Sequence, residues 1–130
     1  MRKQTFDPWV WGPSTNSVQA VEIKQPEGTL YCSGQVAIDA NGVPSNGSMR
    51  EQLIQTIQNL EQLINESGYK CQGIVRLNVF TTSTMEFFTT CTDIYQAFIT
   101  KHDIKQATTM IEVKGLFANL TVELEATVVK

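Results

Sequence analysis

Side-chain alternation near the C-terminus constrains the fold of this chain more than any other feature of its sequence. Two β-strands are predicted there, at Gln106–Lys114 and Thr121–Val129. Successive side chains of a strand point to opposite faces, so each strand has a polar face and a face that can pack under helices. In the first strand the polar face is predicted to hold Thr108, Met110, Glu112 and Lys114, and the other face Thr109, Ile111 and Val113. With Glu123 and Glu125 of the second strand, the polar faces carry three carboxylates, so we expect the functional site there.

Size and composition predict one globular domain over residues 1–130. Hydrophobic residues make up 42% of the chain, which is enough for a single packed core. No run of about 18 apolar residues is present, so no membrane span is expected. The first residues lack the apolar segment of a secretion signal, and we predict a cytoplasmic location. Residues 1–17 are predicted to form an irregular N-terminal arm, in which Trp9 and Trp11 either cover the sheet edge or a neighbouring subunit, or line a ligand pocket.

Charge and residue counts exclude several classes of function. The formal net charge is −3, and the ten lysines and arginines are spread along the chain without a basic cluster. Such a surface cannot neutralise a row of phosphates, so we expect no nucleic-acid partner. Three widely spaced cysteines and a single histidine do not supply the spacing of a metal site or of a disulfide framework. We expect neither a metal nor a cofactor.

Turn, periodicity and capping signals predict the other elements. Strands at Val18–Ile23 and Thr29–Ile38 flank a Pro-Glu-Gly turn and are predicted to pair as a hairpin. Two helices follow, each opened by a Ser-x-x-Glu capping box, at Ser48 and at Ser83. A strand rich in β-branched and aromatic residues, Gly73–Thr82, separates the two helices.

The predicted order β-β-α-β-α-β-β defines an α+β fold. Each helix connects two strands, so both helices are expected on one face of a mixed sheet. Two helices cannot cover both faces of the sheet, so the second face is either solvated or buried in an oligomer. The three glutamates of the polar faces and the apolar N-terminal arm favour an oligomer.

Four segments resemble the Rid (YjgF-like) family in sequence and in order. They are Leu30–Gln35 (LYCSGQ), Ile74–Phe80, Tyr95–Phe98 (YQAF) and Val122–Ala126 (VELEA). The resemblance implies a chorismate-mutase-like α+β fold, a homotrimer with clefts between subunits, and a small-molecule metabolite as the ligand. Active members of this family hydrolyse reactive enamines and imines, such as 2-aminoacrylate, to a 2-oxoacid and ammonia.

The chain departs from the family pattern at the position that binds the substrate carboxylate. Active relatives have an arginine where this chain has Thr108, followed by a small residue and a cysteine where it has Thr109 and Met110. A hydroxyl cannot form the bidentate pair that a guanidinium makes with a carboxylate. Losing such a buried pair costs about 2–5 kcal/mol, or roughly 30- to 5000-fold in affinity. The chain therefore resembles an arginine-lacking branch of the family.

Other family site residues have counterparts here. Glu123 matches the glutamate that positions the attacking water, and Ser33 and Gly34 match the backbone turn beside the ligand. Tyr31 and Phe117 are candidate walls of the cleft on family grounds. A carboxylate close to the other two glutamates of the polar face would have a raised pKa, which suits acid–base chemistry. Alternatively, these glutamates only pair with strand ends or threonines in a trimer interface.

Three cations are candidates to replace the missing arginine. Lys114 shares a strand with Thr108 but lies about 20 Å away at normal strand rise, so it could serve only across a subunit boundary. Arg76 lies on a neighbouring strand, and Arg50 in the first turn of a helix. None of the three is a convincing substitute within one subunit.

Two classes of function remain open. The first is a hydrolase, deaminase or tautomerase that acts on a small imine, enamine or enol through Glu123 and a water. The second is a non-catalytic trimer whose cleft binds a metabolite for sensing or for partner contact. An endoribonuclease or translation inhibitor, a label sometimes attached to the family, does not fit an acidic chain without a basic stripe.

Overall fold

A mixed four-stranded sheet forms the centre of the computed structural model, which describes residues 1–130. The strands are β3 (Thr29–Tyr31), β4 (Ile74–Thr81), β5 (Met110–Glu112) and β6 (Val122–Val129), in the order β3-β6-β4-β5. Strands β4 and β5 are parallel, whereas β6 runs antiparallel to both β3 and β4. The predicted strands Gly73–Thr82 and Thr121–Val129, observed as β4 and β6, therefore lie together at the centre of the sheet.

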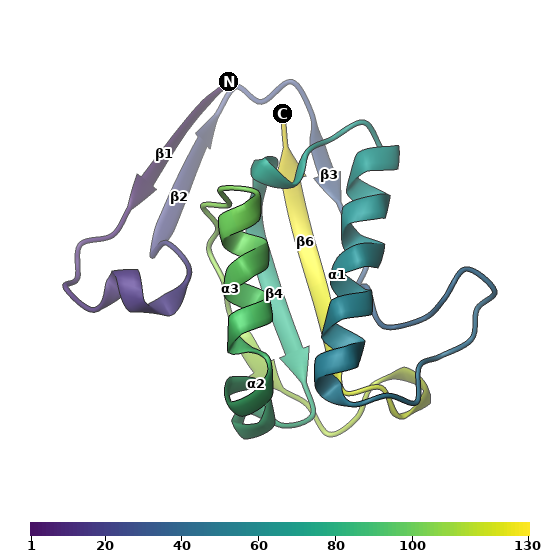
Figure 1. The fold of residues 1–130 in the computed structure, drawn as a ribbon. Helices are drawn as coiled ribbons and strands as arrows, with labels where there is room; N and C mark the ends of the chain where they lie inside the picture. Colours follow the sequence, from purple (N-terminus) through teal and green to yellow (C-terminus); the bar gives the residue numbers. More distant parts are fainter.

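Helices cover one face of this sheet, as Figure 1 shows. They are α1 (Met49–Glu66), α2 (Thr84–Thr90) and α3 (Thr92–Lys101). The apolar faces of β4, β6 and α1 supply fully buried core side chains, among them Leu53, Leu60, Ile64, Leu77, Val79, Val122, Leu124 and Val128. The α+β class and the one-sided helical layer are as predicted, but the layer contains three helices rather than two. None of the helices is long and apolar enough to cross a membrane.

The helix ends follow from the capping residues in the sequence. The Ser48 hydroxyl accepts a bond from the Glu51 backbone N–H, and the Glu51 carboxylate accepts one from the Ser48 backbone N–H, so the predicted capping box is complete. Helix α2 has the first half of the same motif, because Ser83 Oγ accepts from the Glu86 backbone N–H. After α1, Gly68 adopts a positive φ of 82°, which glycine tolerates without strain.

The second predicted helix is broken at Cys91, which divides it into α2 and α3. The hydroxyls of Thr89, Thr90 and Thr92 all donate to backbone carbonyls four residues earlier. Such bonds compete with the helical backbone bonds and bend a helix. A run of threonines therefore ends one helix and begins another at Cys91, whose φ and ψ of −123° and −11° are not helical.

The N-terminal region differs from the prediction in its pairing. The arm is not irregular throughout, because Arg2–Phe6 forms strand β1 and Gly12–Thr15 forms a short 3-10 helix. Strand β2 (Ala20–Lys24) pairs antiparallel with β1 in a separate two-stranded ribbon, so the predicted hairpin between β2 and Thr29–Ile38 is wrong. Strand β2 has no buried residue, whereas Leu30 of β3 packs against the core, and this burial places β3 on β6 instead.

The side-chain faces of β5 are the reverse of the prediction. Met110 pairs with the core residue Val79 and is partly buried against the helices. Ile111 pairs with Phe80, which in turn pairs with Glu123, so these three side chains share the face that the helices leave uncovered. The reversal arises because β5 is an edge strand with polar and apolar residues on both faces, and tertiary packing decides between them.

Candidate functional site

A β-bulge in the chain after β3 positions the Ser-Gly pair that resembles the family's ligand-binding turn. Tyr31 pairs with Thr127 of β6, and Gln35 next forms a bridge with Leu124. Three residues lie between Tyr31 and Gln35, but only two lie between their partners on β6, so one extra residue is accommodated. Bulges of this kind bend a strand and often occur beside active sites. The bulge carries Ser33 and Gly34.

Glu123 packs against the bulge at Gly34. A Cβ atom at position 34 would overlap the Glu123 carboxylate, so a larger residue there would force the Glu123 side chain to move. Glu123 is partly buried, and burial raises the pKa of its carboxyl group above the ordinary value, with a further contribution from the charge of Glu125. Glu125 also accepts a hydrogen bond from Asn78 Nδ2 at 3.1 Å. A carboxyl group with a raised pKa can hold or release a proton closer to neutral pH, which acid–base chemistry requires.

The raised pKa of Glu123 predicts a stability change in the Glu123→Gln variant. A carboxyl group whose pKa is higher in the folded state stabilises the fold below its ordinary pKa of 4.5, and this contribution is lost as the pH rises through the raised value. At neutral pH, removing the desolvated charge should therefore raise the melting temperature, and the gain should vanish in acid. Thermal unfolding at the two pH values measures this, with Glu27→Gln in an exposed turn as the control. A gain that is equal at both pH values would contradict the assignment.

A second locus lies on the helix-covered side of the sheet. A pocket of about 420 Å³ opens there between residues 14–17, helices α2 and α3, and strand β5. Its lining is Ser14, Thr15, Asn16, Ser17, Phe87, Phe88, Thr92, Tyr95, Thr108 and Met110. The pocket therefore includes Thr108, the residue at which the resemblance to active relatives predicts an arginine, but it has no lysine, arginine or histidine in its wall.

A hydrogen-bond network that the sequence did not reveal holds Thr108. The Gln106 side chain is fully buried, and its Nε2 donates to the backbone carbonyl of Asn16 at 2.9 Å and to Thr108 Oγ1 at 3.1 Å. The same Nε2 lies 3.5 Å from Tyr95 Oη. Burial raises the pKa of the Tyr95 phenol, which keeps it protonated. The side chains beside Thr108 are thus neutral.

The structure separates the predicted site residues into two groups within one subunit. Ser33, Gly34 and Glu123 lie together on the uncovered face, whereas Thr108 and Met110 line the pocket on the other face. The three remaining candidates belong to neither group. Thr109 is exposed at the sheet edge, Tyr31 is 79% exposed in β3, and Phe117 is 67% exposed in the short 3-10 helix Phe117–Asn119.

Glu112 and the three candidate cations lie away from the predicted acidic cluster. Glu112 does not join Glu123, because its carboxylate accepts the Thr84 backbone N–H at 2.9 Å at the first turn of α2. Lys114 is exposed in the loop after β5. Arg76 is exposed on the uncovered face, in register with Thr127. No cation of the same subunit lines the Thr108 pocket.

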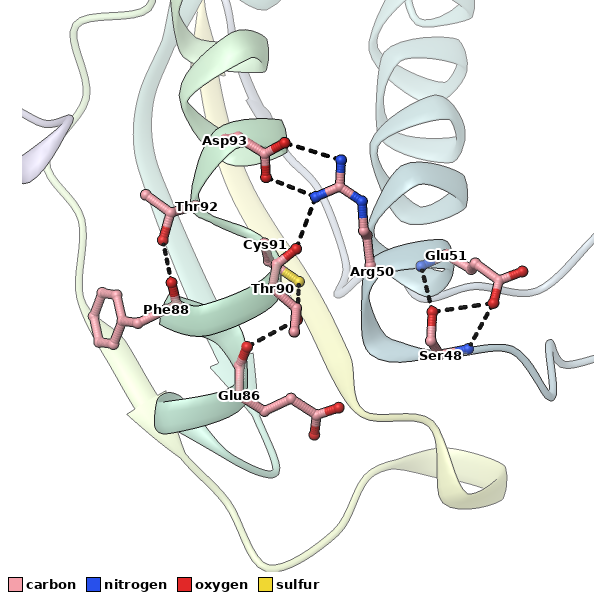
Figure 2. Close-up of polar contacts among 9 residues, drawn as sticks. All are labelled: Ser48, Arg50, Glu51, Glu86, Phe88, Thr90, Cys91, Thr92 and Asp93. Carbon is pink, nitrogen blue, oxygen red and sulfur yellow. Dashed lines mark hydrogen bonds and ion pairs between the residues drawn. The ribbon is translucent and has the colours of Figure 1, made fainter.

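Arg50 is engaged in a structural ion pair, which Figure 2 shows in detail. Its guanidinium forms a bidentate pair with the Asp93 carboxylate at 2.7 and 2.9 Å, and donates to the Thr90 carbonyl at 2.9 Å. The hydrogen bond from Arg50 lowers the pKa of Asp93. Arg50 therefore links the start of α1 to the break between α2 and α3, and so helps to fix the two helix ends that carry Phe88 and Thr92 into the pocket wall.

Some pocket residues could not be predicted, because only contacts between distant parts of the chain bring them to the pocket. Phe88 and Tyr95 fit the packing pattern of a helix, and Tyr95 is buried in the core as that pattern predicts, whereas Phe88 is 63% exposed. Both residues also line the pocket. The threonine run that breaks the helix was the available signal for Thr92. Gln106 had none, because a single glutamine at the start of a predicted strand predicts nothing about its burial.

A larger hollow of about 660 Å³ lies elsewhere, between the ends of α1 and α3. Its central group is Glu61, which accepts from Lys101 Nζ at 2.9 Å and lies 2.6 Å from His102 Nε2. None of the predicted site residues lines this hollow. No three histidine, cysteine, aspartate or glutamate side chains come close enough to hold a metal ion anywhere in the structure.

The sheet order, the one-sided helical layer and the Ser-Gly bulge define an α+β protein of the chorismate-mutase-like type found in YjgF and Rid proteins. The family model described as "Endoribonuclease L-PSP" matches residues 12–130, and the chain belongs to this YjgF/Rid family. It is 31% identical over 112 residues to a RutC family protein of Aquifex aeolicus, covering 86% of each chain. It is 30% identical over 106 residues to the 2-iminobutanoate/2-iminopropanoate deaminase of Salmonella typhimurium, covering 78% of this chain and 79% of the relative.

A solved structure agrees over the whole chain. The Rid family protein YyfB of Yersinia pestis, whose function is unknown, superposes with a TM-score of 0.82 at 28% sequence identity, and each chain is covered completely. The likeness therefore includes the N-terminal region, which the family model does not match before residue 12.

Proposed function

We propose that this chain is a Rid-type protein that binds a small metabolite in clefts completed between the subunits of a homotrimer. The observation that carries the proposal is the separation of the two groups of site residues. Glu123 and Gly34 lie on the uncovered face of the sheet, and Thr108 lies in a pocket on the opposite side. The two groups can act on one ligand only when the face of one subunit meets the pocket of another.

In this proposal Glu123 is the acid–base residue. Its carboxyl group, with a pKa raised by burial and by Glu125, activates a water or transfers a proton at a small imine, enamine or enol. The chemistry needs no cofactor. The name of the Salmonella relative, a 2-iminobutanoate/2-iminopropanoate deaminase, supports this reaction class.

The substrates of that relative are not the substrates that we propose here. A 2-imino acid carries a carboxylate, and the wall around Thr108 offers it no cation. Arg50, a candidate replacement, is already bound to Asp93 and to the Thr90 carbonyl. We therefore propose that the chain lacks efficient deaminase activity on 2-aminoacrylate and 2-iminobutanoate.

Two assays test the proposal. Light scattering should give the mass of a trimer. Ammonia release from freshly generated 2-iminobutanoate should be far slower than with the Salmonella enzyme, whereas an uncharged imine should be hydrolysed by the wild type and not by Glu123→Gln. A monomer in solution, or turnover of 2-iminobutanoate at the rate of the relative, would overturn the proposal.

A second candidate function is a trimer that binds metabolites without catalysis. It is favoured by the state of the Cys32 thiol next to Ser33, which is buried with a raised pKa and therefore cannot serve as a covalent nucleophile. If no imine, enamine or enol turns over but ligands still raise the melting temperature, this candidate is correct. We also propose a cytoplasmic location. The acidic charge of the chain supports the lack of a nucleic-acid partner.

A further inference from the structure

We propose that the Thr108 pocket selects uncharged carbonyl-type ligands over carboxylates, through the hydroxyl pair of Thr108 and Tyr95, which Gln106 positions. The inference rests on the proposed function, since it names the ligand class of the same site. It goes beyond the missing arginine because it assigns a new recognition element, together with two residues, Tyr95 and Gln106, that the family resemblance does not implicate.

The orientation of the Gln106 amide follows from its neighbours. The carbonyl oxygen of Asn16, 2.9 Å away, can only accept a hydrogen bond, so the atom facing it must be Nε2 and not Oε1. The second Nε2 hydrogen then points at Thr108 Oγ1 at 3.1 Å. Gln106 Oε1 is buried without a hydrogen-bond partner. Leaving this acceptor buried and unpaired is unfavourable. In this orientation, however, the two amide hydrogens are directed at the Asn16 carbonyl and at Thr108 Oγ1.

Counting hydrogen-bond donors shows what the pocket offers to a ligand. Thr108 Oγ1 accepts from Gln106, so its own hydroxyl hydrogen is directed elsewhere. Tyr95 Oη lies near the same Nε2, and no protein carbonyl or carboxylate accepts from either hydroxyl. Two hydroxyls can share only one hydrogen bond between them. At least one O–H donor therefore remains for a ligand acceptor, and both residues line the pocket.

The rest of the wall fits a neutral ligand with an apolar body. Phe87, Phe88 and Met110 supply the apolar surface, and none of the ten lining residues carries a formal charge at neutral pH. A carboxylate entering this pocket would lose hydration without gaining a cation, which is unfavourable. A ketone, ester, amide or neutral imine loses less hydration and can accept the hydroxyl hydrogen bond.

Two probes of nearly equal shape test the selectivity: acetophenone, a neutral aryl ketone, and benzoate. Their dissociation constants are measured by titration with the wild type and with Thr108→Val, Thr108→Ser and Tyr95→Phe. We expect the wild type to bind acetophenone at least about tenfold more tightly than benzoate. Valine keeps the shape of Thr108 without its hydroxyl, and should weaken acetophenone binding by about 2- to 10-fold, whereas serine should retain it. The double variant Thr108→Val/Tyr95→Phe should lose the ketone preference.

Gln106 is tested as a positioning residue through the same ratio of affinities. Gln106→Met has a similar volume without the amide hydrogens, and should reduce the ketone preference as Thr108→Val does. If that variant does not fold, the Val and Ser variants still decide the inference. Benzoate binding as tight as acetophenone binding, an unchanged ratio in Thr108→Val, or no binding of either probe would overturn it. This experiment measures binding alone. Its result therefore does not depend on the Glu123-dependent turnover that tests the proposed function.

Discussion

Replacing Gly73 by alanine is expected to lower the free energy of unfolding by about 3 kcal/mol, which corresponds to a melting temperature roughly 10 °C lower. Gly73 immediately precedes β4, and a Cβ atom there would overlap the backbone carbonyl oxygen of Val129 and lie 3.2 Å from Cγ1 of Val128. The obstacle is the backbone of the central strand β6, which cannot move aside as the end of a flexible side chain can. The new methyl group must therefore push β4 and β6 apart.

Gly115→Ala is the matched control for this experiment. No atom lies within 4 Å of the position of its Cβ, and its φ is not in the positive region, so alanine should fit there without strain. Restricting the unfolded chain should leave stability unchanged or raise it by about 0.4–1 kcal/mol. Thermal and denaturant unfolding of both variants give the comparison. Equal stability of the two variants would show that the contact between Gly73 and β6 is not tight in solution.

The helix and the two central strands of the fold could be predicted from sequence. Helix α1 and strands β4 and β6 combine strong periodicity with a local end signal, such as the capping box at Ser48. The predicted start of α1 and the predicted bounds of β4 and β6 agree with the structure to within about two residues. Their apolar faces are buried as the alternation predicts, with Val122, Leu124 and Val128 in the core. For these elements, local propensity and tertiary packing favour the same structure.

The errors arise where the outcome depends on contacts between distant parts of the chain. The hairpin prediction for β2 used turn chemistry, but pairing with β1 or with β3 is a competition that local sequence does not decide. The face of β5 was reversed because Met110 and Ile111 are both apolar, and only the position of α2 and α3 determines which one is covered.

The sequence named candidate residues for the site, but it could not give the geometry of the site. Glu123 and Gly34 were each assigned to the site by resemblance, and the structure shows that they are in contact. Thr108 could be identified as a departure from the family pattern. Its separation from Glu123, on the opposite face of the sheet, could not be deduced without the register of β4 and β5. That register is what makes a second subunit necessary in the proposed function.

The largest functional effect is expected from Thr108→Arg. An arginine at this position supplies the cation that the pocket lacks, and its planar guanidinium can bind a carboxylate with two parallel hydrogen bonds. Truncating such pairs costs about 2–5 kcal/mol, so benzoate or pyruvate should bind at least about 30-fold more tightly to the variant than to the wild type. Calorimetric titration measures the gain.

Two control variants separate the effect of the guanidinium in Thr108→Arg from the effects of charge and of side-chain length. Thr108→Lys adds the same charge as a single point and should gain less than arginine, because an ammonium cannot make the bidentate pair. Thr108→Met adds length without charge and should gain nothing. If the cleft is completed by Glu123 of a second subunit, ammonia release from 2-iminobutanoate should also appear in Thr108→Arg and be lost when Glu123→Gln is added. Tighter carboxylate binding without turnover would confirm that the pocket binds the ligand and would show that Glu123 is not catalytic. No gain in binding would show that position 108 does not face the ligand.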